Sequence, residues 1–173
     1  MRIVAVLFSI LSICQGLQAQ TYDEWIESSF RYLDANQPDS AEIALKNALR
    51  TEPANPVNPF LFNNLGTLQR QMGKNEEALF SYTMALSRHP KNEVFLKARA
   101  SLFSGMGQLQ NALIDYNSLL NEHPDDLESL YQRGLLYLNL KNFEAAENDF
   151  ARMLALNPNS LYARLGFASL YKI

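Results

Sequence analysis

The sequence contains few cysteine, histidine, glycine and proline residues, and each shortage excludes a class of protein. Cys14 is the only cysteine among 173 residues, which excludes an internal disulfide framework and a cysteine-ligated metal site. Seven glycines and seven prolines are too few for a collagen-like or low-complexity chain. Acidic and basic residues are interspersed, with a formal net charge of −3. Because no basic run is present, we expect no nucleic-acid partner.

Charge is almost absent from the first twenty residues. Arg2 is the only charged residue before Asp23, and the stretch from Ile3 to Cys14 is nearly all apolar. A membrane span needs about 20 apolar residues, so this run is too short, but it is typical of a secretory signal peptide. We therefore predict a signal peptide over 1–19, a mature chain over 20–173 without a transmembrane span, and export to the periplasm or cell envelope.

One alternative concerns the N-terminus. The residues Leu11 to Cys14 loosely resemble a bacterial lipobox, in which the cysteine is lipidated and becomes the first residue of the mature protein. That pattern favours Gly or Ala before the cysteine, and Ile13 departs from it. A lipoprotein anchored through Cys14 is therefore the less favoured prediction.

The main signal in the remaining chain is an internal repeat. Proline recurs at intervals of 37, 34 and 34 residues, and the same three intervals separate four alanines and four large apolar residues that follow the alanines by four positions. These columns are Pro53, Pro90, Pro124 and Pro158; Ala41, Ala78, Ala112 and Ala146; and Leu45, Tyr82, Tyr116 and Phe150.

Within each repeat the apolar residues follow a helical period, so the sequence predicts two antiparallel helices per repeat. The short turns between them carry Asn36, Gly73 and Gly107, residue types that tolerate the left-handed conformation, and Lys141 stands at the fourth turn. Asp125 with Glu128 suggests a capping box at the first helix of repeat four, and Asn142 suggests an N-cap for its second helix. Pro56 to Asn58 lengthens the first junction by three residues.

These residues resemble the tetratricopeptide-repeat (TPR) family, whose unit is 34 residues long. Repeat four carries Gly134, Tyr137, Ala146 and Pro158 at the family's motif positions, whereas repeat one has Ser28 and Ser29 where Leu and Gly are expected. The resemblance implies an all-α solenoid with repeats at about 22–55, 59–92, 93–126 and 127–160, forming one right-handed superhelical domain. A C-terminal helix over 160–173 would cap it, with Ala168 and Tyr171 in the family's pattern.

The resemblance also implies a concave groove, lined by the first helices, that binds a peptide or protein segment. Carried over position by position, the groove has apolar ends and a polar middle. Its residues would be Ile26, Phe30 and Leu33 in repeat one; Asn63, Asn64, Thr67 and Arg70 in repeat two; Lys97, Ser101 and Ser104 in repeat three; and Tyr131, Leu135 and Leu138 in repeat four. Some family members clamp acidic chaperone tails, but of the matching positions (Ile26, Phe30, Asn64, Val94 and Ala98) only Asn64 agrees with that clamp.

No catalytic motif is present. The chain has no phosphate-binding glycine loop, serine nucleophile motif or zinc-protease helix. His89 and His123 precede successive repeat prolines, and we interpret them as repeated loop residues rather than as a metal pair. We expect no enzyme activity, cofactor or metal.

Two hypotheses of function remain open besides a groove-binding adaptor. The C-terminal helix carries Leu161, Leu165, Phe167 and Leu170, which either pack on repeat four or remain available for self-association. The chain is then a self-associating structural component, or a lipid-anchored accessory subunit of an envelope complex. Its partner is otherwise an unidentified protein or peptide.

Overall fold

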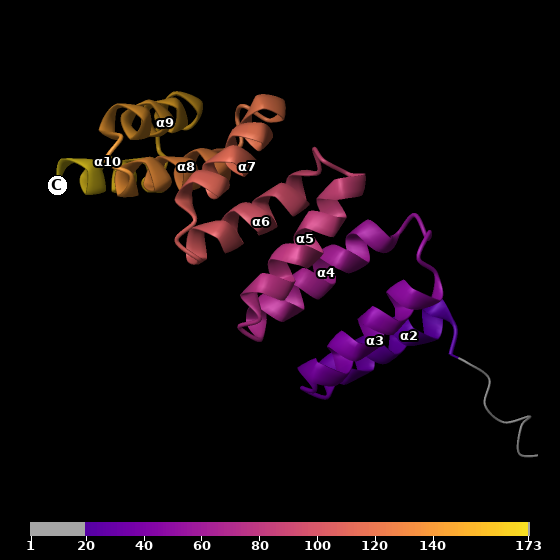
Figure 1. The fold of residues 1–173 in the computed structure, drawn as a ribbon. Coiled ribbons are helices and arrows are strands. Elements are labelled where there is room, and N and C mark those ends of the chain that lie inside the picture. Colours follow the sequence, from indigo (N-terminus) through magenta and orange to yellow (C-terminus); the bar gives the residue numbers. More distant parts are fainter. Residues whose placement is uncertain (1–19, 173) are drawn as a thin grey trace, which may run out of the picture. The chain divides into compact units, whose positions relative to one another are not determined.

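The structure, a computed structural model, describes residues 20–172. Over these residues it contains helices and connecting turns but no strand, which confirms the all-α prediction (Figure 1). The predicted signal peptide and Cys14 lie outside the described residues. The helices are α2 (Tyr22–Asp34), α3 (Pro38–Thr51), α4 (Asn58–Gln71), α5 (Asn75–Arg88), α6 (Glu93–Gly105), α7 (Leu109–Glu122), α8 (Leu127–Asn139), α9 (Phe143–Leu156) and α10 (Leu161–Tyr171).

The turn between the two helices of each repeat has the predicted left-handed residue. The φ angles of Asn36, Gly73, Gly107 and Lys141 are +55°, +75°, +74° and +58°. A left-handed residue lets the following amide groups bond back to the last carbonyls of the first helix. In repeat one, for example, the Asn36 amide donates to the Leu33 carbonyl at 2.9 Å and the Gln37 amide donates to Tyr32 at 2.8 Å.

The helix caps agree with the sequence at one helix and differ from it at another. The side chain of Asn142 accepts a hydrogen bond from the Ala145 amide and caps α9, as predicted. The predicted capping box at Asp125 is wrong by one residue, because α8 begins at Leu127 and its N-cap is Asp126, which accepts from the Ser129 amide at 2.9 Å.

Close packing of the paired helices depends on small residues facing aromatic rings. The four repeat alanines are fully buried, and so are Tyr82 and Phe150. A Cβ atom added to Gly66 would lie 2.9 Å from the Tyr82 ring, and one added to Gly134 would lie 2.5 Å from the Phe150 ring. Both glycines are therefore required for the close approach of first and second helices.

Repeats three and four carry an arginine where the TPR pattern has leucine, and each arginine is paired. Arg99 donates to both carboxylate oxygens of the buried Asp115 at 2.8 Å. It also reaches back to Thr83 of the preceding repeat at 3.3 Å. Arg133 repeats the arrangement with Asp149 and Asn117, so each arginine connects three consecutive helices.

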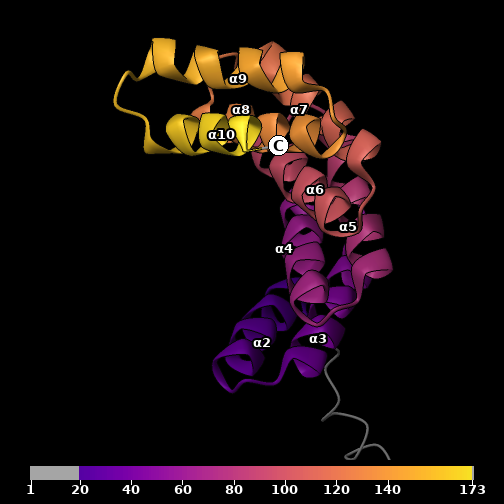
Figure 2. The same ribbon diagram turned by 90° about the vertical axis from the view of Figure 1, so that its left-hand side faces the viewer.

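Helix α10 packs on α9 and α8 (Figure 2). Its contact residue is Gly166, where an added Cβ would lie 2.5 Å from the Phe150 ring. Phe167 and Leu170 are half-buried against the same core. Four large side chains of α10 remain exposed: Leu161, Tyr162, Leu165 and Tyr171.

The chain divides into two compact units at the lengthened first junction, with the boundary between Ala54 and Asn55. In the first unit, Ser28 and Ser29 are buried at the places where Leu and Gly were expected. The Ser29 hydroxyl donates to the Ile26 carbonyl at 2.6 Å, so its polar group is satisfied within the helix. The second unit holds α4 to α10. No helix within residues 20–172 has both the length and the apolar character needed to cross a bilayer.

Candidate partner-binding groove

The predicted groove residues of repeats two to four all lie on first helices of the second unit. Helix α4 contacts α6, and α8 contacts α10. Asn64, Arg70 and Ser101 are exposed, and the others are half-buried. Helix α4 carries Asn63, Asn64, Thr67 and Arg70; α6 carries Lys97, Ser101 and Ser104; and α8 carries Tyr131 and Leu135.

The residues on α4 form the polar part of this face, and several bond to their neighbours. Arg70 donates to the Ser101 hydroxyl of α6 at 3.1 Å. The Thr67 hydroxyl donates to the Asn63 carbonyl at 3.0 Å and shares a second hydrogen bond with the Tyr82 hydroxyl at 3.1 Å. The side-chain oxygen of Asn63 is buried and has no hydrogen-bond partner among the described residues. Buried acceptors are usually satisfied, so this amide is the unusual group of the polar face.

Lys97 is not a free cation. Its ammonium group lies 2.7 Å from a carboxylate oxygen of Glu93, 3.0 Å from Asp126 and 3.3 Å from Glu128. Burial alone would lower the pKa of Lys97, but hydrogen bonds to these acids outweigh it and raise the pKa above its ordinary value. An anionic ligand would therefore compete with three carboxylates that are already in place.

The residues on α8 are covered in part by α10. The ring of Tyr131 lies 5.2 Å from that of Tyr162, centroid to centroid. Beside them is a hollow of about 530 Å³ lined by Leu135, Leu138, Asn139, Ser169 and Lys172. The predicted apolar end of the groove is thus a partly filled surface with one hollow.

Sequence reasoning assigned no groove residue to the C-terminal helix, although the repeat period was sufficient to find them. Ser169 follows Leu135 by 34 residues, and Lys172 follows Leu138 by the same interval. Both line the hollow together with the leucines from which they are spaced. The groove columns therefore continue onto α10.

The groove positions of repeat one belong to the first unit and are described separately. Phe30 and Leu33 are 57% and 42% exposed on α2, and Ile26 is half-buried. These exposed apolar side chains form the predicted apolar end in repeat one.

The two histidines lie in different surroundings. The ring of His89 packs against Phe60 and Phe95, at centroid distances of 6.0 and 6.4 Å. His123 lines a second hollow of about 410 Å³, together with Glu93, Glu122, Pro124, Asp125 and Asp126. Within residues 20–172 no group of three or more potential ligand side chains is placed to hold a metal ion.

Comparison with protein families decides the identity of the repeat. Tetratricopeptide-repeat profiles match residues 61–92 and 103–165, which cover helices from all the repeats of the second unit. The chain belongs to the TPR family.

A crystal structure of a TPR protein from Parabacteroides merdae is similar to this TPR chain, with 52% identity and a TM-score of 0.85. The match covers 89% of this chain and 60% of the Parabacteroides protein, so the chain spans well under two thirds of that protein. No significant match was found among curated proteins.

Two more distant structures share the fold. The first TPR domain of Spaghetti (RPAP3), solved with the HSP90 peptide SRMEEVD, is 24% identical with a TM-score of 0.62, over 68% of this chain and 94% of that one. MamA from Desulfovibrio magneticus RS-1 is 17% identical with a TM-score of 0.72, over 90% and 96% of the two chains. These likenesses concern the fold alone.

Proposed function

We propose that this TPR protein is a protein-interaction scaffold whose first-helix groove binds a peptide or protein segment in the cell envelope. The observation that supports it most is the alignment of the groove columns on α4, α6 and α8, which leads to a hollow lined by Leu135 and Leu138. Amide groups at one end can bond to a peptide backbone, and the hollow at the other end can receive an apolar side chain.

The partner differs from the acidic tail bound by the RPAP3 domain. Lys97 is neutralised by three carboxylates, and only Asn64 agrees with the clamp that holds such tails in other family members. The groove therefore favours a backbone and apolar contacts in its middle over a strongly anionic segment.

Crosslinking in native cells, followed by affinity capture and mass spectrometry, tests the proposal. The informative variant combines Asn63→Ala and Asn64→Ala, and we expect it to lose most of the captured partner while remaining folded, since Asn63 has no side-chain oxygen partner to lose. The matched control combines Asn111→Ala and Asn148→Ala, two exposed asparagines on the second helices α7 and α9, and it should capture normally. Equal capture by both double variants would show that the binding surface lies elsewhere.

Self-association is the second candidate, because α10 leaves Leu161 and Tyr171 exposed at 67% and 74%. Phe167 and Leu170 are half-buried against the core, so changing them would disturb the fold. Light scattering on the variant Leu161→Glu with Tyr171→Glu is the cleaner test, and a mass that falls to that of one chain would support this candidate.

The proposed envelope location depends on the N-terminal signal sequence. Cell fractionation and N-terminal sequencing of the native protein test it directly, and a chain that retains Arg2 in the cytosol would disprove export. Cys14→Ser distinguishes a lipid anchor, since only a lipoprotein would lose detergent partitioning with this change.

A further inference from the structure

The hollow at the C-terminal end of the groove has a defined chemistry that the proposed function leaves open. It lies between two first-type helices, with Leu135 and Leu138 from α8 and Ser169 and Lys172 from α10. The inference below rests on the proposed groove and concerns what the groove selects.

The bottom and the rim of the hollow differ in polarity. Leu138 is 8% exposed and Leu135 is half-buried, so both present a restricted apolar surface. Asn139 and Ser169 are exposed at the rim. The Ser169 hydroxyl donates to the Leu165 carbonyl at 2.9 Å, which leaves its oxygen as an acceptor, whereas the Asn139 amide can both donate and accept. A hollow of about 530 Å³ accommodates an aliphatic side chain and adjoining backbone.

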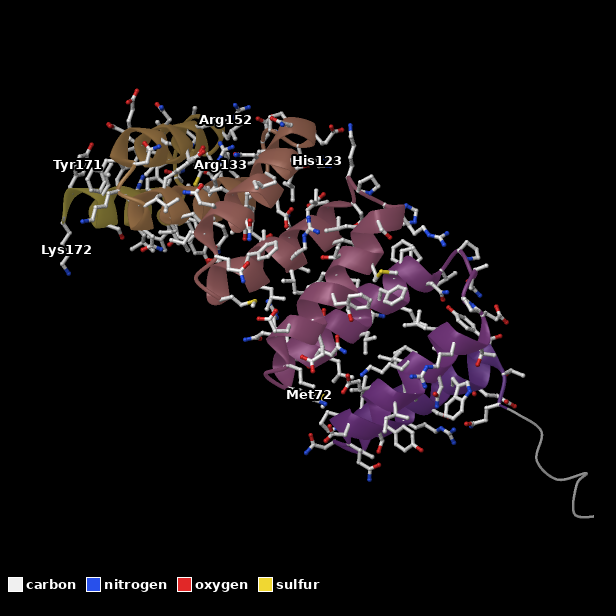
Figure 3. The ribbon with its side chains drawn as sticks, viewed as in Figure 1. Met72, His123, Arg133, Arg152, Tyr171 and Lys172 are labelled. Carbon is white, nitrogen blue, oxygen red and sulfur yellow. The ribbon has the colours of Figure 1, made fainter. Side chains whose placement is uncertain are left out.

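The charge of the hollow comes from Lys172. None of the five lining residues is acidic, and Lys172 forms no ion pair with residues 20–172, unlike Lys97, Arg99 and Arg133. Figure 3 shows its side chain extending away from the ribbon beyond the end of α10, whereas Arg133 lies among the helices. Lys172 is thus a cation available to a ligand in the same groove where Lys97 is already neutralised.

We propose that this hollow binds an extended peptide segment that inserts an aliphatic side chain between Leu135 and Leu138 and pairs a neighbouring acidic side chain with Lys172. The apolar bottom supplies affinity through burial. The ammonium group and the rim amide supply selection, because a carboxylate accepts hydrogen bonds from both. The groove thus accepts a negative charge at its C-terminal end and disfavours one at Lys97.

A peptide pair tests this inference on the full chain by methyl NMR. The probes are acetyl-Ser-Gly-Leu-Glu-Gly-Ser-amide and the same peptides with Gln in place of Glu or Ala in place of Leu, each titrated to about 10 mM because a short segment binds weakly. We expect saturable shifts at the methyl groups of Leu135 and Leu138. The Glu peptide should bind about three- to fivefold more tightly than the Gln peptide, the ratio of an exposed ion pair, and the Ala peptide should bind least.

Two variants assign the charge preference. Lys172→Gln should make the Glu and Gln peptides equal in affinity without moving the protein's own spectrum elsewhere, whereas Lys91→Gln, at an exposed lysine of the α5–α6 junction, should leave the preference unchanged. Equal affinities in the unmodified protein, shifts outside the hollow, or no saturable shift would each overturn the inference. If partner capture still depends on Asn63 and Asn64 in that case, only the selection at the hollow is wrong and the groove remains.

Discussion

The carboxylate of Asp126 has two roles that single residues rarely combine. It caps α8 through the Ser129 amide and pairs with Lys97 of the preceding repeat at 3.0 Å. Burial raises the pKa of Asp126, but hydrogen bonds from Ser129 and Lys97 outweigh this and lower it overall. Because the folded protein favours the charged carboxylate, Asp126 adds stability above its unfolded pKa of about 4.

A pH series should reveal this contribution. The stabilisation from Asp126 is fully present above about pH 5 and is lost as the pH falls from about 4 through the lowered folded pKa. Asp126→Asn should therefore be less stable than the unmodified protein at pH 7, and the difference should shrink below about pH 4. Urea unfolding at each pH measures it, and a difference that stays constant down to pH 2 would contradict the assignment.

The glycines beside Phe150 offer a second test at the scale of a residue. Gly134→Ala places a methyl group 2.5 Å from a fully buried ring, and overpacking of this kind costs about 1–3 kcal/mol. Gly105→Ala is the matched control, since nothing lies within 4 Å of the added carbon and alanine is the better helix former by about 0.5–1 kcal/mol. Denaturant unfolding should move the two variants in opposite directions, and a neutral Gly134→Ala would show that the ring can relax.

At the scale of an element, Arg99 and Arg133 connect each first helix to the second helices on both sides. The arginines also lie over aromatic rings of their own helices, 5.8 Å from the centroids of Phe103 and Tyr137. Hydrogen bonding to Asp149 raises the pKa of Arg133, and burial opposes it without reversing it. These pairs replace the leucine of the TPR pattern with a directional contact.

Asp149→Asn tests whether this contact stabilises the element. It leaves the charge of Arg133 half-buried without its partner, so we expect a loss of about 3 kcal/mol, the lower end for a broken buried pair. Asp125→Asn breaks the pair with Arg152, whose side chains are 66% and 49% exposed, and should cost less than about 1 kcal/mol. Thermal unfolding monitored by circular dichroism compares the two, and similar losses would mean that burial does not distinguish them.

The sequence predicts helices in registered repeats better than it predicts α10. Repeat spacing located the left-handed turns, even at Lys141, because the turn geometry is local. The same spacing pointed to Ala168 as the small residue of the terminal helix, yet Ala168 is exposed and Gly166 contacts Phe150. A first helix meets the preceding second helix through a different face from the one that meets its own second helix, and repeat motifs record mainly the latter. For the same reason Lys172 could be placed by spacing, but its lack of a charged partner could not.

At the scale of the whole molecule, the two compact units meet in sequence at the lengthened junction. Residues 52–57 are outside the helices, and most of them are exposed. Exposed connections without regular hydrogen bonding are the preferred sites of proteolysis. In repeat proteins stability is a sum over neighbouring interfaces, so each unit has its own contribution.

Limited digestion with elastase, which cleaves after small aliphatic residues, should therefore cut first at Ala54 or Val57. Mass spectrometry of the early products would show a fragment that begins near Asn55 or Asn58 and retains α4 to α10. Early cleavage within the shorter junctions at Pro90 or Pro124 would instead show that the inserted residues do not weaken the first junction.

The hollow is built by two helices, and only one of them has a neighbour on each side. Any ligand that touches both Leu138 and Lys172 binds only while α10 is docked, so ligand affinity and the docking equilibrium of α10 are linked and each must shift the other equally. Occupancy would slow amide hydrogen exchange in α10, although most of that helix never meets the ligand. Conversely, a change hidden beneath α10, at Gly166 or Phe150, would weaken binding at a distance by releasing the helix that completes the site.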